Sequence, residues 1–133
     1  MTLALLLFGT LVWFAGWTLD VGTTWRGILR AGTIALERNP LARAMFRRFG
    51  VRGGFAALAL LEWAIVAAHW GAARLPCPGL SPQATVAACA ASLATAGVFH
   101  ALAARANHTG RIAPVLLPIL RAYEAMGRRW PGA

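Results

Sequence analysis

The sequence of 133 residues has no lysine, a single tyrosine, two cysteines and only four acidic residues. Cys77 and Cys89 have the spacing of neither a zinc motif nor a disulfide framework, so we expect two free thiols. All thirteen basic residues are arginine, which we interpret as the codon bias of a GC-rich, bacterial genome. A nucleophile elbow, a Gly-rich phosphate loop and a Ser/His/Asp arrangement are also missing, which argues against an enzyme.

Apolar residues dominate what is present. They make up 59% of the chain, the mean hydropathy is +0.60 and only 13% of residues are charged, a composition typical of membrane proteins. Three apolar segments, approximately 3–22, 54–73 and 84–104, are long enough to cross a bilayer as helices. The sequence therefore predicts one all-α membrane domain over 1–133, an integral bundle of three transmembrane helices.

Two further segments have the pattern of amphipathic helices that lie at the membrane interface. The first, over 40–49, begins with the capping pair Asn39-Pro40, places arginines on one side and ends at Gly50. The second, over 114–128, is apolar at its start and basic at its end. We expect both on the cytoplasmic side.

The arginines are distributed very unevenly. Twelve of them fall within 26–52 and 105–129, whereas Arg74 alone accompanies the Pro-rich turn between the second and third spans. A formal charge of +9 would suit nucleic acid, but this placement beside apolar spans is typical of membrane topology instead. We therefore predict a multi-pass protein of the bacterial inner (plasma) membrane, with the N-terminus outside, the C-terminus cytoplasmic, the lipid bilayer as a partner and no nucleic acid.

Polar residues occur at helical spacing in the first and third spans. Gly9, Trp13, Gly16 and Asp20 follow one another at steps of three or four, so the lone acid shares a stripe with small residues and faces protein. His100 lies at a similar depth in the third span. The sequence predicts a polar cluster on the cytoplasmic side that consists of Asp20, Thr23, Glu37, Asn39, Arg43, His100 and Asn107. Within it, we expect Arg43, a neighbouring arginine or a bound cation to contact Asp20 or Glu37.

The second span carries a separate pair of ionisable residues. Glu62 lies near its middle, and His69, seven residues on, shares the same helix face. Ionisable residues inside a span are costly and so point to function. This mid-membrane pair is the only indication of a transport path.

One catalytic interpretation uses two carboxylates and one imidazole of the polar cluster. Asp20, Glu37 and His100 could hold a metal ion and leave a position for a hydrolytic water. The alternative is structural: Asp20 pairs with an arginine of the loop, and Asn39 caps the helix that Pro40 begins. Because no H-E-x-x-H or similar spacing is present, we predict no metal and no cofactor.

The order of these residues resembles a known pattern. Asp20-x-x-Thr23, then Glu37-x-Asn39-Pro40-x-x-Arg43, and Asn107 after the last span are similar to an uncharacterised family of small three-span bacterial and archaeal membrane proteins. The family tends to have a lysine in its second span where this chain has Glu62. The resemblance implies the fold and assigns no mechanism.

Small residues on the outer faces of the helices indicate contacts with further chains. On the third span Ala84, Ala88 and Ala91 allow close helix approach. We expect a non-catalytic accessory or assembly subunit of a larger membrane complex, or a homo-oligomer, that works through protein–protein interaction. The alternative is a membrane-embedded, metal-dependent hydrolase that uses the Asp20, Glu37 and His100 site.

Overall fold

The structure, a computed structural model, describes residues 2–35 and 37–129. Within these residues it is all-α and has no strand. The elements are α1 (Thr2–Ala31), α2 (Pro40–Ala72), α3 (Pro82–Thr109), the short 3-10 helix η1 (Pro114–Leu116) and α4 (Leu117–Arg129). Helices α1, α2 and α3 are each long and apolar enough to cross a bilayer, so the chain is a small membrane protein with the predicted fold class.

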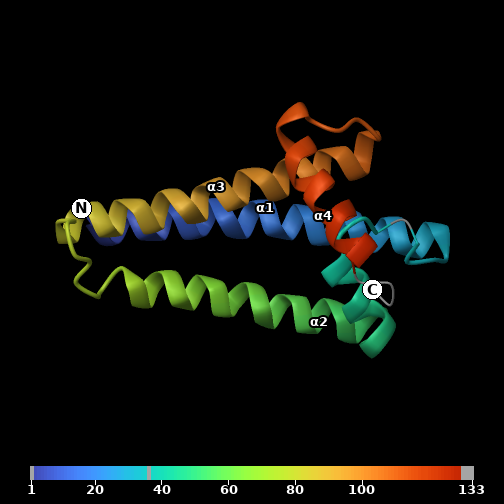
Figure 1. Ribbon diagram of the computed structural model, residues 1–133, viewed down its shortest axis with the longest axis horizontal. Helices are drawn as coiled ribbons and strands as arrows, with labels where there is room; N and C mark the ends of the chain where they lie inside the picture. The colour runs from blue at the N-terminus through green and yellow to red at the C-terminus, as the bar shows by residue number, and fades with distance from the viewer. Residues whose placement is uncertain (1, 36, 130–133) are drawn as a thin grey trace.

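Helices α1 and α3 lie side by side and run in the same direction, and α2 returns in the opposite direction (Figure 1). Small residues make the contact between α1 and α3. A Cβ atom added to Gly9 would collide with the carbonyl oxygen of Ala90, and one added to Gly16 would collide with that of Gly97. Gly9 and Gly16 are seven residues apart on α1, and Ala90 and Gly97 are seven residues apart on α3. Seven residues are about two helical turns, so the contact repeats along one face of each helix.

Helix α2 is interrupted at Gly50, whose φ of 69° and ψ of 171° are not helical. The first segment, residues 40–49, begins with Pro40 and is capped by Asn39, whose side chain accepts hydrogen bonds from the N–H groups of Leu41 and Ala42. Figure 1 shows the interruption as a sharp change of direction at one end of α2. This first segment is the amphipathic helix predicted over 40–49, and Gly50 ends it as expected.

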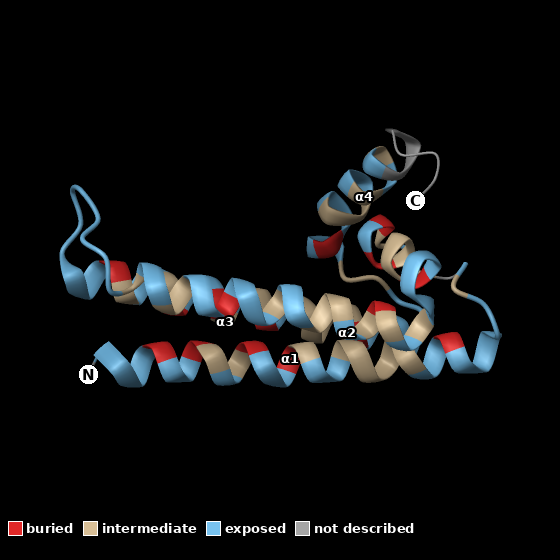
Figure 2. Cartoon of the chain, turned by 90° about the horizontal axis from the view of Figure 1, so that it is seen from below, coloured by how far each residue is buried: buried red, intermediate tan, exposed pale blue. Residues whose placement is uncertain are grey.

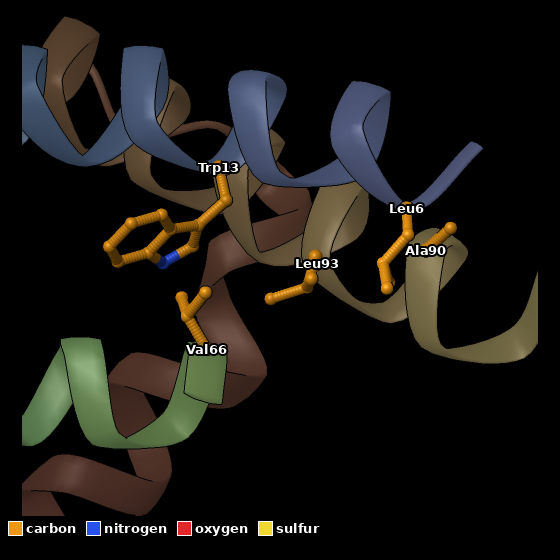
Figure 3. Close-up of a cluster of buried hydrophobic side chains, with 5 residues drawn as sticks. All are labelled: Leu6, Trp13, Val66, Ala90 and Leu93. Carbon is orange, nitrogen blue, oxygen red and sulfur yellow. The ribbon is translucent and has the colours of Figure 1, made fainter. Parts of the chain in front are cut away.

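The apolar core consists of two clusters. The first joins all three spanning helices and contains Leu6, Trp13, Val66, Ala90 and Leu93 (Figure 3). Trp13 and Leu93 are its most deeply buried members, with 1% of each residue exposed. The second cluster packs Ile28 of α1 against Ala42 and Phe46 of the first α2 segment. The bundle is therefore held together both along the spans and at the end where α4 also lies.

Helix α1 is longer than its predicted span. The predicted span ends at about residue 22 and the next predicted helix begins at residue 40, but α1 continues to Ala31. The expectation was wrong because Ile28 has a tertiary partner in the second cluster, which favours a defined helix over a loop. The helix ends at Gly32, which has a φ of 64° and donates its N–H to the carbonyl of Ile28 at 2.9 Å.

Most of the spanning surface is not covered by the chain itself (Figure 2). In the most apolar stretch of each helix, 22% of residues are buried in α1, 17% in α3 and only 11% in α2. Exposed side chains on α2 include Leu60, Trp63 and Ile65. Such a surface suits contact with lipid or with other membrane helices.

Candidate functional site

Asp20 of α1 is bound by two side chains of α3. Its Oδ2 accepts a hydrogen bond from Nδ1 of His100 at 2.9 Å, and its Oδ1 accepts one from Nδ2 of Asn107 at 3.2 Å. Because a carboxylate only accepts, the hydrogen of this contact belongs to Nδ1 of His100. Both carboxylate oxygens of Asp20 are thus used to join α1 to α3.

Asn107 also contacts two threonines at the same level of α1. Its amide donates to Oγ1 of Thr24 at 3.0 Å and to Oγ1 of Thr23 at 3.5 Å. The Thr23 hydroxyl itself donates to the carbonyl oxygens of Leu19 and Asp20, so its oxygen remains an acceptor for Asn107. The structure thus brings together Asp20, Thr23, His100 and Asn107 of the cluster proposed from the sequence.

Glu62 of α2 completes this group. Its Oε1 lies 3.7 Å from Nε2 of His100, and its Oε2 accepts a hydrogen bond from the indole of Trp13 at 3.3 Å. His100 therefore connects carboxylates from two different helices, and we call Asp20, His100 and Glu62 the intramembrane bridge. The sequence grouped Glu62 with His69 instead, and it gave no role to Trp13, although Trp13 shares the stripe of Asp20.

The intramembrane bridge is only partly covered. The exposed fractions of its side chains are 23% for Asp20, 24% for His100 and 26% for Glu62. Two carboxylates and one imidazole carry a net negative charge even when the imidazole is protonated. Chemically, the arrangement can share protons among its three groups and can hold α1, α2 and α3 together.

Glu37 lies in the loop near the bridge. Its Oε1 accepts the backbone N–H of Asn39 at 2.7 Å, so Glu37 and Asn39 shape the start of α2 together. Burial raises the pKa of Glu37, and the nearby charge of Asp20 raises it further. Burial likewise raises the pKa of Tyr123, with contributions from Glu37 and Asp20. Helix α4 therefore brings Tyr123 close to these acids, a placement that no sequence signal indicated.

The sequence predicts an arginine or a cation beside Asp20 or Glu37, and the structure places a histidine beside Asp20. Among the described residues, the ionisable partner of Asp20 is His100, and no arginine lies within 4.0 Å of its carboxylate. Arg43 is close enough to Glu37 to influence the pKa of that carboxyl, but its Nε is buried without a hydrogen-bond partner. At Asp20, His100 takes the place expected for an arginine, because it approaches along the close contact of α1 and α3, which the arginines of the loop do not share.

His69 belongs to a different part of the α2 and α3 contact. Its Nε2 lies 3.0 Å from the hydroxyl of Ser92, and its Nδ1 lies 2.8 Å from the carbonyl of Ile65. Nearby, the indole of Trp70 donates to the hydroxyl of Thr10 at 3.0 Å. The contacts of His69 with Ser92 and of Trp70 with Thr10 join α2 to α3 and α1 at a distance from the intramembrane bridge. Thr10, Trp70 and Ser92 were not identified from the sequence.

The residues considered for a metal do not form one group. Within the described residues, no set of three or more His, Cys, Asp or Glu side chains is placed to hold a metal ion. His100 contacts Asp20 and Glu62, whereas the described hydrogen bond of the Glu37 carboxylate is to Asn39. The three-ligand arrangement of Asp20, Glu37 and His100 that a hydrolase would need therefore gains no support from this geometry.

Comparison of the chain with protein-family models, curated proteins and solved structures finds no match. The site must therefore be interpreted from its own geometry.

Proposed function

We propose that the protein is a non-catalytic subunit of a membrane assembly, made with other membrane proteins or with further copies of itself. One observation carries the proposal: the ionisable side chains of the intramembrane bridge remain about one quarter exposed within the apolar spans. A charged side chain costs about 2.5–3.5 kcal/mol at the centre of a bilayer on insertion scales, and this cost falls toward the boundary, near which Asp20 and His100 lie. Cover by a neighbouring helix reduces this cost.

The weak attachment of α2 supports the same proposal. This helix has the lowest buried fraction of the three, and its contacts with α1 and α3 depend on long side chains such as Glu62, Trp63 and Trp70. A helix that its own chain covers so little has surface available for another helix. The small residues on α3 noted above would allow close approach there as well.

The hydrolase alternative needs a nucleophile or an activated water. Within the described residues, the imidazole nitrogens of the bridge face two carboxylates and not a serine, a cysteine or a three-ligand metal site, which does not favour this alternative. We therefore propose no catalytic activity for this site. We also propose that the chain belongs to the family of small three-span membrane proteins that its Asp20-x-x-Thr23 and Glu37-x-Asn39-Pro40-x-x-Arg43 patterns resemble.

The assembly can be tested by purification in a mild detergent followed by native mass spectrometry. The expected result is a particle heavier than the 14.1 kDa chain, which contains either copies of it or other membrane polypeptides. A variant with Leu60, an exposed α2 residue, replaced by cysteine provides a crosslinking probe, and Leu3→Cys on α1 is its control. A monomer in several mild detergents and in native nanodiscs, with no crosslinked species, would rule the proposal out.

The orientation is proposed from the arginine distribution. Twelve arginines lie toward one end of the bundle and Arg74 lies toward the other, so the arginine-rich end is the cytoplasmic one. Cys77 is exposed in the turn beside Arg74 and should react with a membrane-impermeant thiol reagent in intact cells. Reaction only after permeabilisation would reverse the proposed topology.

A further inference from the structure

At the same end of the bundle, each spanning helix carries an exposed arginine close to the end of its predicted apolar span. These residues are Arg26 of α1, Arg52 of α2 and Arg105 of α3, and we call them the arginine collar. Their levels are set by contacts between the helices. Asn107 of α3 bonds Thr24 of α1, two residues from Arg26 in the sequence.

The level of α2 relative to α1 is set by an aromatic contact. Phe55 lies three residues after Arg52. The centroid of its ring is 5.3 Å from the ring centroid of Trp25 on α1. Phe55 also packs against the cluster of Ile28 and Phe46, so its position is fixed by several neighbours. The start of the α2 span is thus held beside the part of α1 that carries Arg26.

The collar lies at the depth of lipid headgroups. At a helical rise of about 1.5 Å per residue, Arg26 lies roughly 6 Å beyond the predicted end of its apolar span at residue 22. Arg52 lies roughly 3 Å outside the span that begins at residue 54, and Arg105 directly follows the span that ends at residue 104. The headgroup layer on each side of a bilayer is about 5–7 Å thick, so all three guanidinium groups can reach phosphates.

Among the described residues, no carboxylate lies within 4.0 Å of Arg26, Arg52 or Arg105. Asp20 is bound by His100 and Asn107, and Glu37 accepts the N–H of Asn39. We propose that the arginine collar binds the phosphates of anionic phospholipids and selects them over zwitterionic ones.

The chemistry of arginine suits this ligand. A guanidinium group donates two parallel hydrogen bonds to a phosphate, and it stays charged at every physiological pH. Exposed apolar side chains also lie near the collar, since Leu29 is 63% exposed and Phe49 is 52% exposed. A surface of this kind contacts the headgroup with its cations and the upper acyl chain with its apolar groups.

The test is a lipid competition on the full chain in detergent. The protein receives equal amounts of phosphatidylglycerol and phosphatidylcholine with identical acyl chains, and native mass spectrometry counts the bound lipids. Each basic residue near a membrane surface favours anionic lipid by about fivefold. The wild type should therefore retain phosphatidylglycerol at least about tenfold more than phosphatidylcholine, and the preference should weaken at high salt.

The variant Arg26→Gln/Arg52→Gln/Arg105→Gln should lose most of this preference, whereas the corresponding triple lysine variant should keep most of it. Arg74→Gln, which removes an exposed arginine from the opposite end, is the matched control and should behave as wild type. Equal binding of both lipids by the wild type, an unchanged preference in the triple Gln variant, or co-purified RNA in place of the lipid would overturn the proposal. If the triple Gln variant does not fold, single substitutions that each leave the preference intact would overturn it equally.

Discussion

The close pair of α1 and α3 differs in kind from the attachment of α2. Glycines bring the backbones of α1 and α3 into direct contact, as Gly16 and Gly97 show. Helix α2 reaches its neighbours through long side chains, with Glu62 contacting both Trp13 and His100. The difference implies that the pair tolerates no added volume, whereas α2 adds to its apolar packing a few polar contacts that can be removed one at a time.

The largest effect should come from adding volume inside the pair. Gly16→Leu places a side chain where even a Cβ collides with the carbonyl of Gly97, so the helices must separate. We expect a loss of more than about 3 kcal/mol in the free energy of unfolding, measured by thermal unfolding in detergent with circular dichroism. The matched control is Gly22→Ala, because nothing lies within 4 Å of a Cβ there. Similar stability of the two variants would contradict a backbone contact between α1 and α3.

Removing the polar contact of the same pair should have an intermediate effect. Asp20→Ala leaves His100 and Asn107 without their carboxylate acceptor, which should cost about 1–3 kcal/mol of unfolding free energy. Glu124, an exposed residue of α4, provides the control substitution Glu124→Ala. If both variants melt at the same temperature, Asp20 does not contribute to the contact of α1 with α3.

A smaller effect on stability is expected at α2. Glu62→Gln keeps the volume and one oxygen acceptor for Trp13 but removes the charge that faces His100, so we expect a cost below about 1 kcal/mol. Tryptophan fluorescence should still change, because the environment of Trp13 is altered. A loss of stability as large as that of Asp20→Ala would show that α2 is held as firmly as the pair.

The smallest effect concerns the loop between the pair and α2. Because burial raises the pKa of Glu37, the folded state favours the protonated carboxyl. Its contribution to stability is fully present below the unfolded pKa and is lost as the pH rises through the folded pKa. As the pH rises from about 4, the free energy of unfolding of the wild type should therefore fall relative to that of Glu37→Gln. A difference that does not change with pH would show that Glu37 is not buried in the folded protein.

Helical spacing was sufficient to place much of the α1 and α3 contact. Gly9, Trp13, Gly16 and Asp20 recur at three and four residues, and these residues face α3 or α2 in the structure. Periodicity works here because a single helix fixes which of its residues share a face. It cannot give the rotation of α2 about its own axis, so Glu62 was paired with His69 and its contact with His100 was missed.

The sequence by itself determined that the chain is helical, that three segments can cross a bilayer, and that residues 40–49 form a capped helix that ends at Gly50. These features follow from local properties: apolar length, caps and the conformational freedom of glycine. Only the tertiary structure decided that His100 connects Asp20 with Glu62 and that α1 continues to Ala31. Both depend on which helix faces approach in space, a choice made by the close packing of α1 on α3 and of Ile28 on Phe46.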